Sequence, residues 1–122
     1  MFKLTFCLRR TPGMTLDEFQ RYWREDHAPL VAERAEVLGI ARYVQVHTLD
    51  LADVHAGLQA RNGGSPEPFD GVAELWFESL EAMASDDAAV QQALADLLED
   101  EGKFVDLPNS PMWLAQEHAV VG

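Results

Sequence analysis

Basic residues are scarce in this sequence of 122 residues. Lys and Arg number 9 against 21 Asp and Glu, which gives a formal net charge of -12 at pH 7. The summed field of such a chain repels phosphate backbones and anionic lipid surfaces. We therefore expect no nucleic-acid partner and no membrane partner.

Cysteine is nearly absent as well, since Cys7 is the only one. A single cysteine cannot form an intrachain disulfide, and it leaves no CxxC-type metal or redox motif. No histidine or helix start is near Cys7 in the sequence to activate its thiol. We predict that Cys7 is a small buried apolar residue.

Long hydrophobic runs are also missing. The apolar stretch within residues 1–13 is too short to span a bilayer and lacks the order of regions that marks a secretory signal, so we expect a cytoplasmic protein. Hydrophobic residues make up 48% and charged residues 25%, as in folded globular chains. No internal repeat or linker divides the chain, and we predict one domain over residues 1–122.

Hydrophobic periodicity predicts four strands and two main helices. Residues 2–10 alternate between apolar and other side chains, and a Thr15 to Glu18 capping box opens a helix that Gly39 ends. Strands are predicted over residues 2–10, 40–49, 70–78 and 112–121, and helices over residues 16–38 and 80–98, the second with a possible break near residues 85–87. The connection over residues 50–68 contains a possible short helix at residues 51–60 and turn residues at 62–68, and we expect it to be mobile and to gate the pocket.

This element order predicts an α+β fold of the ferredoxin-like kind, with one four-stranded antiparallel sheet and two helices on one face. We expect Val44, Val46, Leu75 and Phe77 to lie beneath the helices. The opposite parity places five mixed side chains on the open face: Tyr43, Gln45, His47, Glu74 and Trp76. That set is too aromatic for solvent and too polar for a dry core. A second copy of the chain would cover it and enclose a pocket for a hydrophobic small molecule.

Pro29 interrupts the first helix. Its missing amide and its ring disfavour regular helical geometry over the preceding turn, so we expect His27 to lie at a break in the helix. Trp23 precedes His27 by four residues and shares its helical face.

Four stretches resemble the EthD-like members of the dimeric α+β barrel superfamily: LRRTPGMTLDEFQRYWREDHAPLV at 8–31, ARYVQVH at 41–47, FDGVAELWFES at 69–79 and DEGKFVD at 100–106. The resemblance implies a dimeric barrel and a small-molecule role. Family members include a component of bacterial ether degradation that accompanies a haem monooxygenase, and dehydratases of fungal pigment pathways. The related muconolactone methylisomerases use a cysteine near the position of Leu75, and its absence here argues against their mechanism.

Four residues are candidates for catalysis. His27 could take and return a proton without a cofactor, and the motif of the resembled family has histidine at this position; the structural alternative is a ring that caps a carbonyl freed by Pro29. His47 is the second candidate, or else a strand-pairing or exposed histidine. Glu74 could act as acid or base if buried, or pair with Arg9 or Arg42 of a second copy. Tyr43 could donate to an oxyanion or simply fill the barrel.

Trp23, Gln45, Trp76 and Arg9 are assigned to substrate binding, although tryptophan more often packs a core. We expect no metal and no cofactor. The set His47, Asp50, Asp53 and His55 matches no standard ligand spacing, and His55 and His118 are predicted at the surface. The acidic run at residues 99–101 is interpreted as a solvated helix end, or as a structural clasp by its match to the family pattern.

The favoured function is cofactor-independent acid-base chemistry on an aromatic or polyketide-like compound, as a dehydratase, cyclase, isomerase or lyase. The alternatives are a cofactorless or haem-associated monooxygenase component of an oxidative pathway, and a binding domain without catalysis. Whether His27 and His47 face a closed pocket discriminates the last of these.

Overall fold

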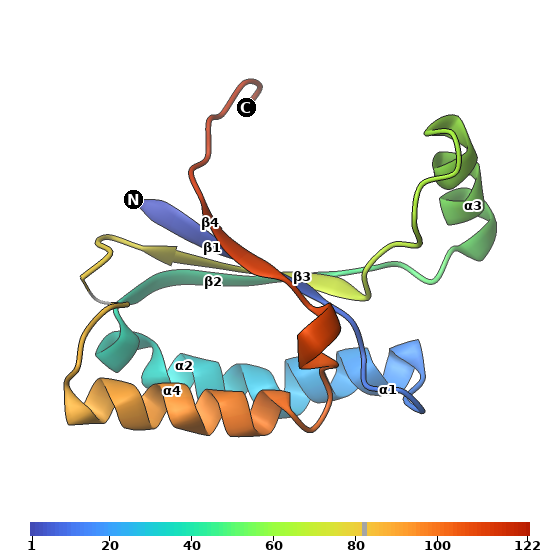
Figure 1. Cartoon of the computed structure of the whole chain (residues 1–122). Helices are drawn as coiled ribbons and strands as arrows, with labels where there is room; N and C mark the ends of the chain where they lie inside the picture. Colours follow the sequence, from blue (N-terminus) through green and yellow to red (C-terminus); the bar gives the residue numbers. More distant parts are fainter. Residues whose placement is uncertain (82) are drawn as a thin grey trace.

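The sheet of this protein has four antiparallel strands. The computed structural model describes residues 1–81 and 83–122. The strands are β1 (Phe2–Leu8), β2 (Ile40–His47), β3 (Gly71–Phe77) and β4 (Met112–Ala115), in the order β2-β3-β1-β4. Helices α1 (Leu16–Arg21), α2 (Ala28–Leu38) and α4 (Ala88–Glu101) cover one face of it (Figure 1). The predicted α+β, ferredoxin-like fold is confirmed.

Local sequence signals set most of the helix ends. Thr15 and Glu18 form the predicted capping box, with reciprocal hydrogen bonds of 3.1 and 3.0 Å, and Gly39 ends α2 with a φ of 69°. Helix α4 begins later than predicted, at Ala88, because the Asp87 carboxylate accepts a hydrogen bond from Ala89 N at 2.8 Å and starts the helix there. Of residues 80–87, residue 82 lies outside the described residues and the others form turns and irregular backbone.

The side chains of β2 point to the opposite sides of the sheet from those we predicted. Tyr43 packs against the core under the helices, whereas Val46 is 44% exposed on the open face. Polar side chains fit beneath the helices here because they bond to one another: Gln45 Nε2 donates to Tyr43 Oη at 2.8 Å, and His47 Nε2 lies 2.8 Å from Gln45 Oε1. For β3 the predicted parity is right, since Leu75 packs toward the helices.

The open face is partly covered by the chain itself. Trp76 lies on it, as predicted, yet is only 8% exposed, because Lys3 and Arg42 lie over its ring and its Nε1 donates to the Glu117 carboxylate. Strand β4 stops at Ala115 rather than at residue 121, since its pairing with β1 covers only residues 3–6 of that strand. The rest of the tail leaves the sheet (Figure 1).

Helix α3 (Ala52–Arg61) is the predicted short helix in the long connection, and it stands apart from the sheet and the other helices (Figure 1). None of its residues is buried. Helix α3 therefore does not cover the interior between the sheet and helices α1, α2 and α4.

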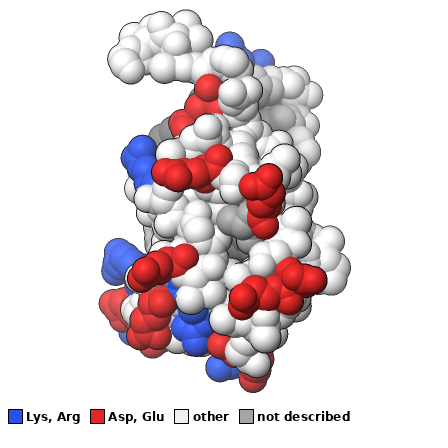
Figure 2. Space-filling view, turned by 90° about the vertical axis from the view of Figure 1, so that its left-hand side faces the viewer, with Lys and Arg blue, Asp and Glu red and all other residues white. Residues whose placement is uncertain are grey.

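Acidic side chains are spread over the surface that Figure 2 shows, with basic ones between them. On this side of the molecule the basic residues form no continuous patch. No helix within residues 1–81 and 83–122 is long and apolar enough to cross a membrane.

Candidate active site

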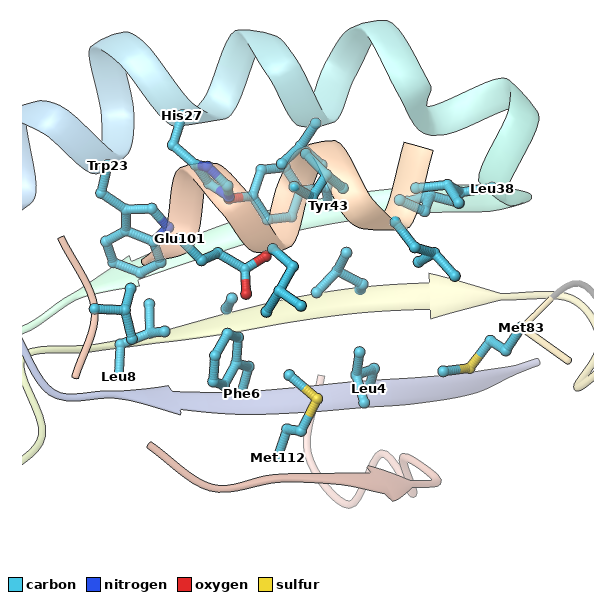
Figure 3. A pocket seen from close by; sticks show the side chains of 18 of the residues that line it. Leu4, Phe6, Leu8, Trp23, His27, Leu38, Tyr43, Met83, Glu101 and Met112 are labelled. Carbon is cyan, nitrogen blue, oxygen red and sulfur yellow. The ribbon is translucent and has the colours of Figure 1, made fainter. Parts of the chain in front are cut away.

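A cavity of about 300 Å³ lies between the sheet and the covering helices of a single chain (Figure 3). Its walls come from both buried clusters of the core, one around Phe19 and Phe104 and the other around Val31 and Leu97. This cavity differs from the pocket that we expected, because it lies within one chain on the helix side of the sheet. A pocket between two copies on the open face stays a prediction. None of residues 50–68 is in the lining of the cavity within the chain, so the predicted gating role of that connection is not supported by its position.

The lining is apolar except at one end. Three ionisable side chains, His27, Tyr43 and Glu101, meet there beside Trp23 (Figure 3). The exposed lining residues are Leu94, Leu98 and Met112, which places the mouth between α4 and β4. The cavity is thus mostly apolar, with its polar groups together at one end, as is common for small-molecule sites.

His27 occupies the predicted irregularity in the long helix. Residues Tyr22–His27 form a π-helical turn, in which the Ala28 amide donates to the Trp23 carbonyl five residues back. Pro29 follows within the first turn of α2, where its missing amide is tolerated. The predicted break is present, and Trp23 and His27 both line the cavity within the chain.

A buried carboxylate orients the imidazole. His27 Nδ1 lies 2.7 Å from Asp100 Oδ2, and Tyr22 Oη donates to Asp100 Oδ1 at 2.6 Å. Lys103 Nζ lies 3.5 Å from the same Oδ1. His27 and Asp100 are each 5% exposed. The alternative in which His27 caps a backbone carbonyl does not hold at Nδ1, because the partner of that nitrogen is this carboxylate.

The protonation states follow from burial and from this pair. Burial lowers the pKa of His27, and the neighbouring Asp100 carboxylate offsets only part of the shift. Burial works to raise the pKa of Asp100, but hydrogen bonds from Tyr22 and His27, with Lys103 nearby, outweigh it and lower the pKa. At neutral pH the pair is an aspartate and a neutral imidazole. Nδ1 then carries the hydrogen that Asp100 accepts, and Nε2 is left as the basic nitrogen.

Glu101 follows Asp100 and ends α4. Its carboxyl group points into the cavity (Figure 3). Burial, with a smaller contribution from the Asp100 charge, raises the pKa of Glu101 to about 7. A carboxyl group in this state can hold a proton near neutral pH.

Tyr43 is the member of the polar row on β2 that reaches the cavity. Burial raises its pKa, and hydrogen bonds with Gln45 and Trp23 offset part of that rise. Since Gln45 donates to the Tyr43 oxygen, the phenolic hydrogen remains available to a ligand.

His47 and Gln45 do not line the cavity, although they are hydrogen-bonded in one row with Tyr43. The His47 ring stacks on Trp23 with centroids 4.4 Å apart, and Gln45 Nε2 also donates to the Trp23 carbonyl at 2.9 Å. Burial, and then the charge of Arg24, lower the pKa of His47. The structure thus places His47 as a support for Trp23 rather than at the cavity wall.

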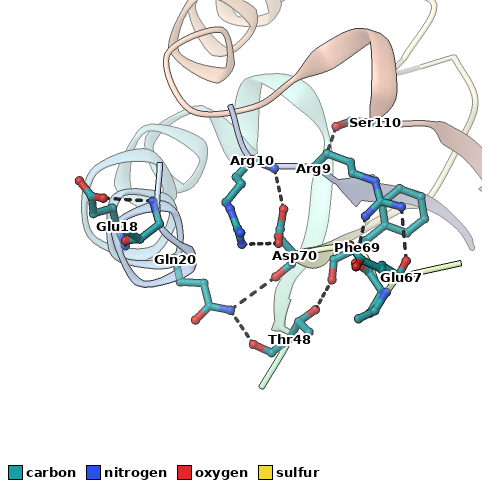
Figure 4. A network of polar contacts seen from close by, with 11 residues as sticks. Arg9, Arg10, Glu18, Gln20, Thr48, Glu67, Phe69, Asp70 and Ser110 are labelled. Carbon is teal, nitrogen blue, oxygen red and sulfur yellow. Dashed lines mark hydrogen bonds and ion pairs between the residues drawn. The ribbon is translucent and has the colours of Figure 1, made fainter. Parts of the chain in front are cut away.

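Glu74, Trp76 and Arg9, which we assigned to the site, lie elsewhere. Glu74 accepts from Lys3 Nζ of the same chain at 2.6 Å on the open face. The Arg9 guanidinium donates to the Pro68 carbonyl at 3.0 Å and stacks on Phe69, where it holds the end of the long connection (Figure 4).

Arg10 and Asp70 make the neighbouring contact in the same network. The Arg10 amide and guanidinium donate to the two Asp70 oxygens at 2.7 and 2.9 Å (Figure 4). Both arginines thus fasten the start of β3 to the end of β1.

Sequence reasoning missed Asp100, Glu101 and Tyr22. The interpretation of the acidic run as a solvated helix end holds for Glu99, which is exposed, but is wrong for Asp100, which is buried, and for Glu101, which lines the cavity. The alternative of a structural clasp fits Asp100, which bonds to Tyr22 and His27. A signal was present: Glu101 follows Leu97 by four residues and Leu94 by seven, the spacing of one helical face. Asp100 lies 73 residues from His27 in the chain, so no local pattern could pair them.

No group of three or more potential ligands of the His, Cys, Asp or Glu type is assembled among the described residues. The set His47, Asp50, Asp53 and His55 is therefore not brought together. Cys7 is 8% exposed, as predicted, and burial raises the pKa of its thiol.

Comparison with known families agrees with the four stretches of resemblance, because the model of the EthD domain matches residues 11–108. The chain belongs to the EthD family. Among solved structures, an EthD-like protein from Ralstonia eutropha matches with a TM-score of 0.62 and 18% identity, over 99% of this chain and 95% of that one. An ethyl tert-butyl ether D (EthD) family protein from Bacillus halodurans matches with a TM-score of 0.56 and 15% identity, over 97% and 100%.

A third similar structure is a dimeric protein of ferredoxin-like fold from Bacteroides fragilis, with a TM-score of 0.57 and 8% identity over 95% of both chains. At these identities the likeness of the EthD-domain chain to solved structures concerns the fold. Function must be argued from the residues of the cavity.

Proposed function

We propose that this EthD-family protein catalyses cofactor-independent acid-base chemistry on an aromatic or polyketide-like compound bound in the cavity between sheet and helices. The observation that carries the proposal is the buried His27 and Asp100 pair at the polar end of an apolar cavity. A positioned histidine is the side chain that most often transfers protons in general acid-base catalysis.

His27 is the base in this proposal. With Nδ1 donating to Asp100, the lone pair of Nε2 takes a proton from a carbon next to a carbonyl group of the substrate. Asp100 keeps the ring in the correct tautomer and stabilises the imidazolium that forms. Returning the proton to another substrate atom completes an isomerisation. Returning it to a departing hydroxyl releases water in a dehydration.

Tyr43 is the donor to the oxygen on which negative charge develops. Its raised pKa keeps it protonated, and the hydrogen bond from Gln45 leaves its hydrogen free to point at the substrate. Trp23 supplies a flat wall beside this end of the cavity. These features favour a planar, largely apolar substrate with one carbonyl group near His27.

Proton exchange tests the proposal before the substrate is known. The neutral ketone 2-acetylnaphthalene would be incubated with the protein in D₂O, and deuterium entering its methyl group followed by NMR. We expect the wild type to accelerate exchange and His27→Gln to lower the rate about 100-fold or more. His55→Gln is the matched control, because His55 is outside this cavity, and it should exchange like the wild type.

Two outcomes would contradict the proposal. Binding of the ketone without exchange would favour a binding domain, and exchange that survives His27→Gln would remove His27 as the base. The oxidative alternative is separated by an oxygen electrode and a haem titration, because oxygen uptake or a Soret band with this protein would support it instead.

We further propose a homodimer in which a second copy covers the open sheet face. The residues that support it differ from those predicted, since Tyr43 and His47 lie on the other face and Trp76 is covered. The exposed apolar side chains of the open face are Val46 and Trp113, at 44% and 48%. Light scattering at micromolar concentration should give twice 13.6 kDa, and the monomer mass would contradict the dimer.

A further inference from the structure

Glu101 stands out among the groups at the polar end of the cavity. It is the last residue of α4, and its carboxyl group points into the cavity rather than to solvent (Figure 3). Within the described part of the chain, no side chain makes a hydrogen bond to that carboxyl group. A polar group that faces a cavity without a protein partner is normally satisfied by water or by a ligand.

Among the described residues, no cation lies in the cavity to hold Glu101 as a carboxylate. The cavity lining, as far as the structure describes it, contains neither lysine nor arginine. Lys103, the basic residue closest to it in sequence, pairs with Asp100 at 3.5 Å and is 61% exposed. Asp100 adds a negative charge beside Glu101. Both effects favour the neutral acid, in keeping with the pKa of about 7.

The groups that face Glu101 from the surrounding elements do not change this balance. The π-helical turn contributes His27, which its lowered pKa keeps neutral, and β2 contributes Tyr43, which its raised pKa keeps protonated. From α4 itself comes the Asp100 carboxylate. The described lining residues that β1, β3 and β4 contribute are apolar: Leu4, Phe6, Leu8, Ala73, Leu75, Phe77 and Met112.

We propose that Glu101 recognises the substrate by donating a hydrogen bond to its carbonyl oxygen, alongside the one from Tyr43, and that the cavity therefore selects uncharged aromatic carbonyl compounds over the matching carboxylates. The inference rests on the proposed function for the choice of site and adds the substrate class. A carboxylate ligand would bring a second negative charge beside the fixed charge of Asp100, into a cavity whose described lining contains neither lysine nor arginine. An uncharged ketone offers Glu101 an acceptor without that charge.

Three probes of similar shape test the selection directly: 2-acetylnaphthalene, 2-naphthoate and 2-ethylnaphthalene. The first is a neutral acceptor, the second an anion, and the third has no acceptor. Binding would be measured by calorimetry or fluorescence at about pH 6 and pH 8. We expect the wild type to prefer the ketone to both other probes at pH 6, and to lose part of that preference at pH 8, where Glu101 is ionised.

Two variants assign the effect to Glu101. Glu101→Leu should lower the preference for the ketone over 2-ethylnaphthalene about 3- to 10-fold, the scale of one hydrogen bond. Glu101→Gln keeps a donor, so it should retain the preference while removing its pH dependence. Since no described side chain bonds to the Glu101 carboxyl group, replacing it should not impair folding, and a thermal melt checks this for both variants.

The proposal is overturned if the wild type binds 2-naphthoate as tightly as the ketone at pH 6, or if Glu101→Leu keeps the full preference. Neither result depends on catalysis, because these are binding measurements, and His27→Gln should retain the ketone preference even though it loses proton exchange. A protein that prefers the ketone but does not accelerate proton exchange supports recognition by Glu101 without the proposed chemistry. One that accelerates exchange without preferring the ketone supports the chemistry without that recognition, so the two proposals are tested separately.

Discussion

Gly71 lies directly against the indole of Trp23. A Cβ atom placed on Gly71 would fall 2.4 Å from Cζ3 of Trp23 and 3.0 Å from the Val46 carbonyl oxygen. Only glycine fits at this point of β3, so a wall of the candidate active site approaches the sheet backbone more closely than a side chain allows.

We expect Gly71→Ala to lower the free energy of unfolding by about 1 to 3 kcal/mol, the usual range for overpacking a core. Gly57→Ala is the matched control, because a Cβ atom placed on Gly57 would meet nothing within 4 Å beyond the backbone of its own helix α3. That change should leave stability unchanged or raise it by up to about 1 kcal/mol. Urea melts measure both, and equal effects would contradict the close contact.

The next prediction concerns the carboxylate behind His27. Asp100→Asn removes the charge that raises the pKa of the imidazole, so that pKa should fall further below its ordinary value. We expect proton exchange to slow by about 100-fold or more, since the tautomer is no longer fixed. NMR titration of the His27 ring measures the shift directly.

Tyr22→Phe is the companion change. It removes one hydrogen bond to Asp100 but leaves the charge in place. The His27 pKa should move little, and stability should fall by about 1 kcal/mol. A His27 pKa that responds equally to both substitutions would show that the Asp100 charge is not what sets it.

Glu101 makes stability depend on pH. Its folded pKa of about 7 is above the unfolded value, so the folded state holds this proton more tightly and is stabilised below the unfolded pKa. That stabilisation is lost as pH rises through the unfolded pKa toward 7, by up to about 3 kcal/mol.

His27 opposes this trend, because its lowered pKa makes the folded state gain stability as pH rises toward its unfolded value. The Glu101 contribution is therefore the difference between the wild type and Glu101→Gln. Chemical denaturation at several pH values should show the wild type losing stability relative to the variant between about pH 4.5 and 7. A constant difference would contradict the neutral acid.

The mouth of the cavity gives a kinetic prediction. Leu98 lines the cavity yet is 58% exposed, so Leu98→Trp should change stability by less than about 0.5 kcal/mol while narrowing the entrance. We expect slower association of 2-acetylnaphthalene in stopped-flow fluorescence. Leu49→Trp is the control, exposed by 66% and outside the lining. Equal association rates in the two variants would place the entrance elsewhere.

The backbone plan was predictable because its signals are local. The Thr15 capping box, the left-handed Gly39 and the alternation in β1 each act within a few residues, and each is present in the structure. The break at His27 was also predictable, because Pro29 alone implies an irregular turn. The exact form of that break, a π-helical turn, is set by tertiary contacts as well.

The face of β2 was not predictable in the same way. A row of Tyr43, Gln45 and His47 is more polar than the valines between them, and hydropathy alone assigns the valines to the core. The row is buried because its members bond to one another and to the carbonyl of Trp23. Such partners are visible only once the helix has been placed over the strand.

The site residues likewise divide into those with a local signal in the sequence and those whose position depends on distant parts of the chain. His27 and Trp23 were found because they share a helical face and a motif. Asp100 was missed because an acid in the last turn of a helix is usually solvated, and its burial depends on Tyr22 and His27 arriving from another part of the chain.

The carbonyl of Trp23 ties strand and helix to one atom. In the widened π-helical turn it accepts both the Ala28 amide and the Gln45 side chain, and Gln45 also holds the Tyr43 oxygen. The proton donor Tyr43 on β2 and the base His27 on the helix are thus both positioned relative to the same main-chain carbonyl. Their alignment is a property of the backbone, which side-chain replacements on the solvent side of the helix leave intact.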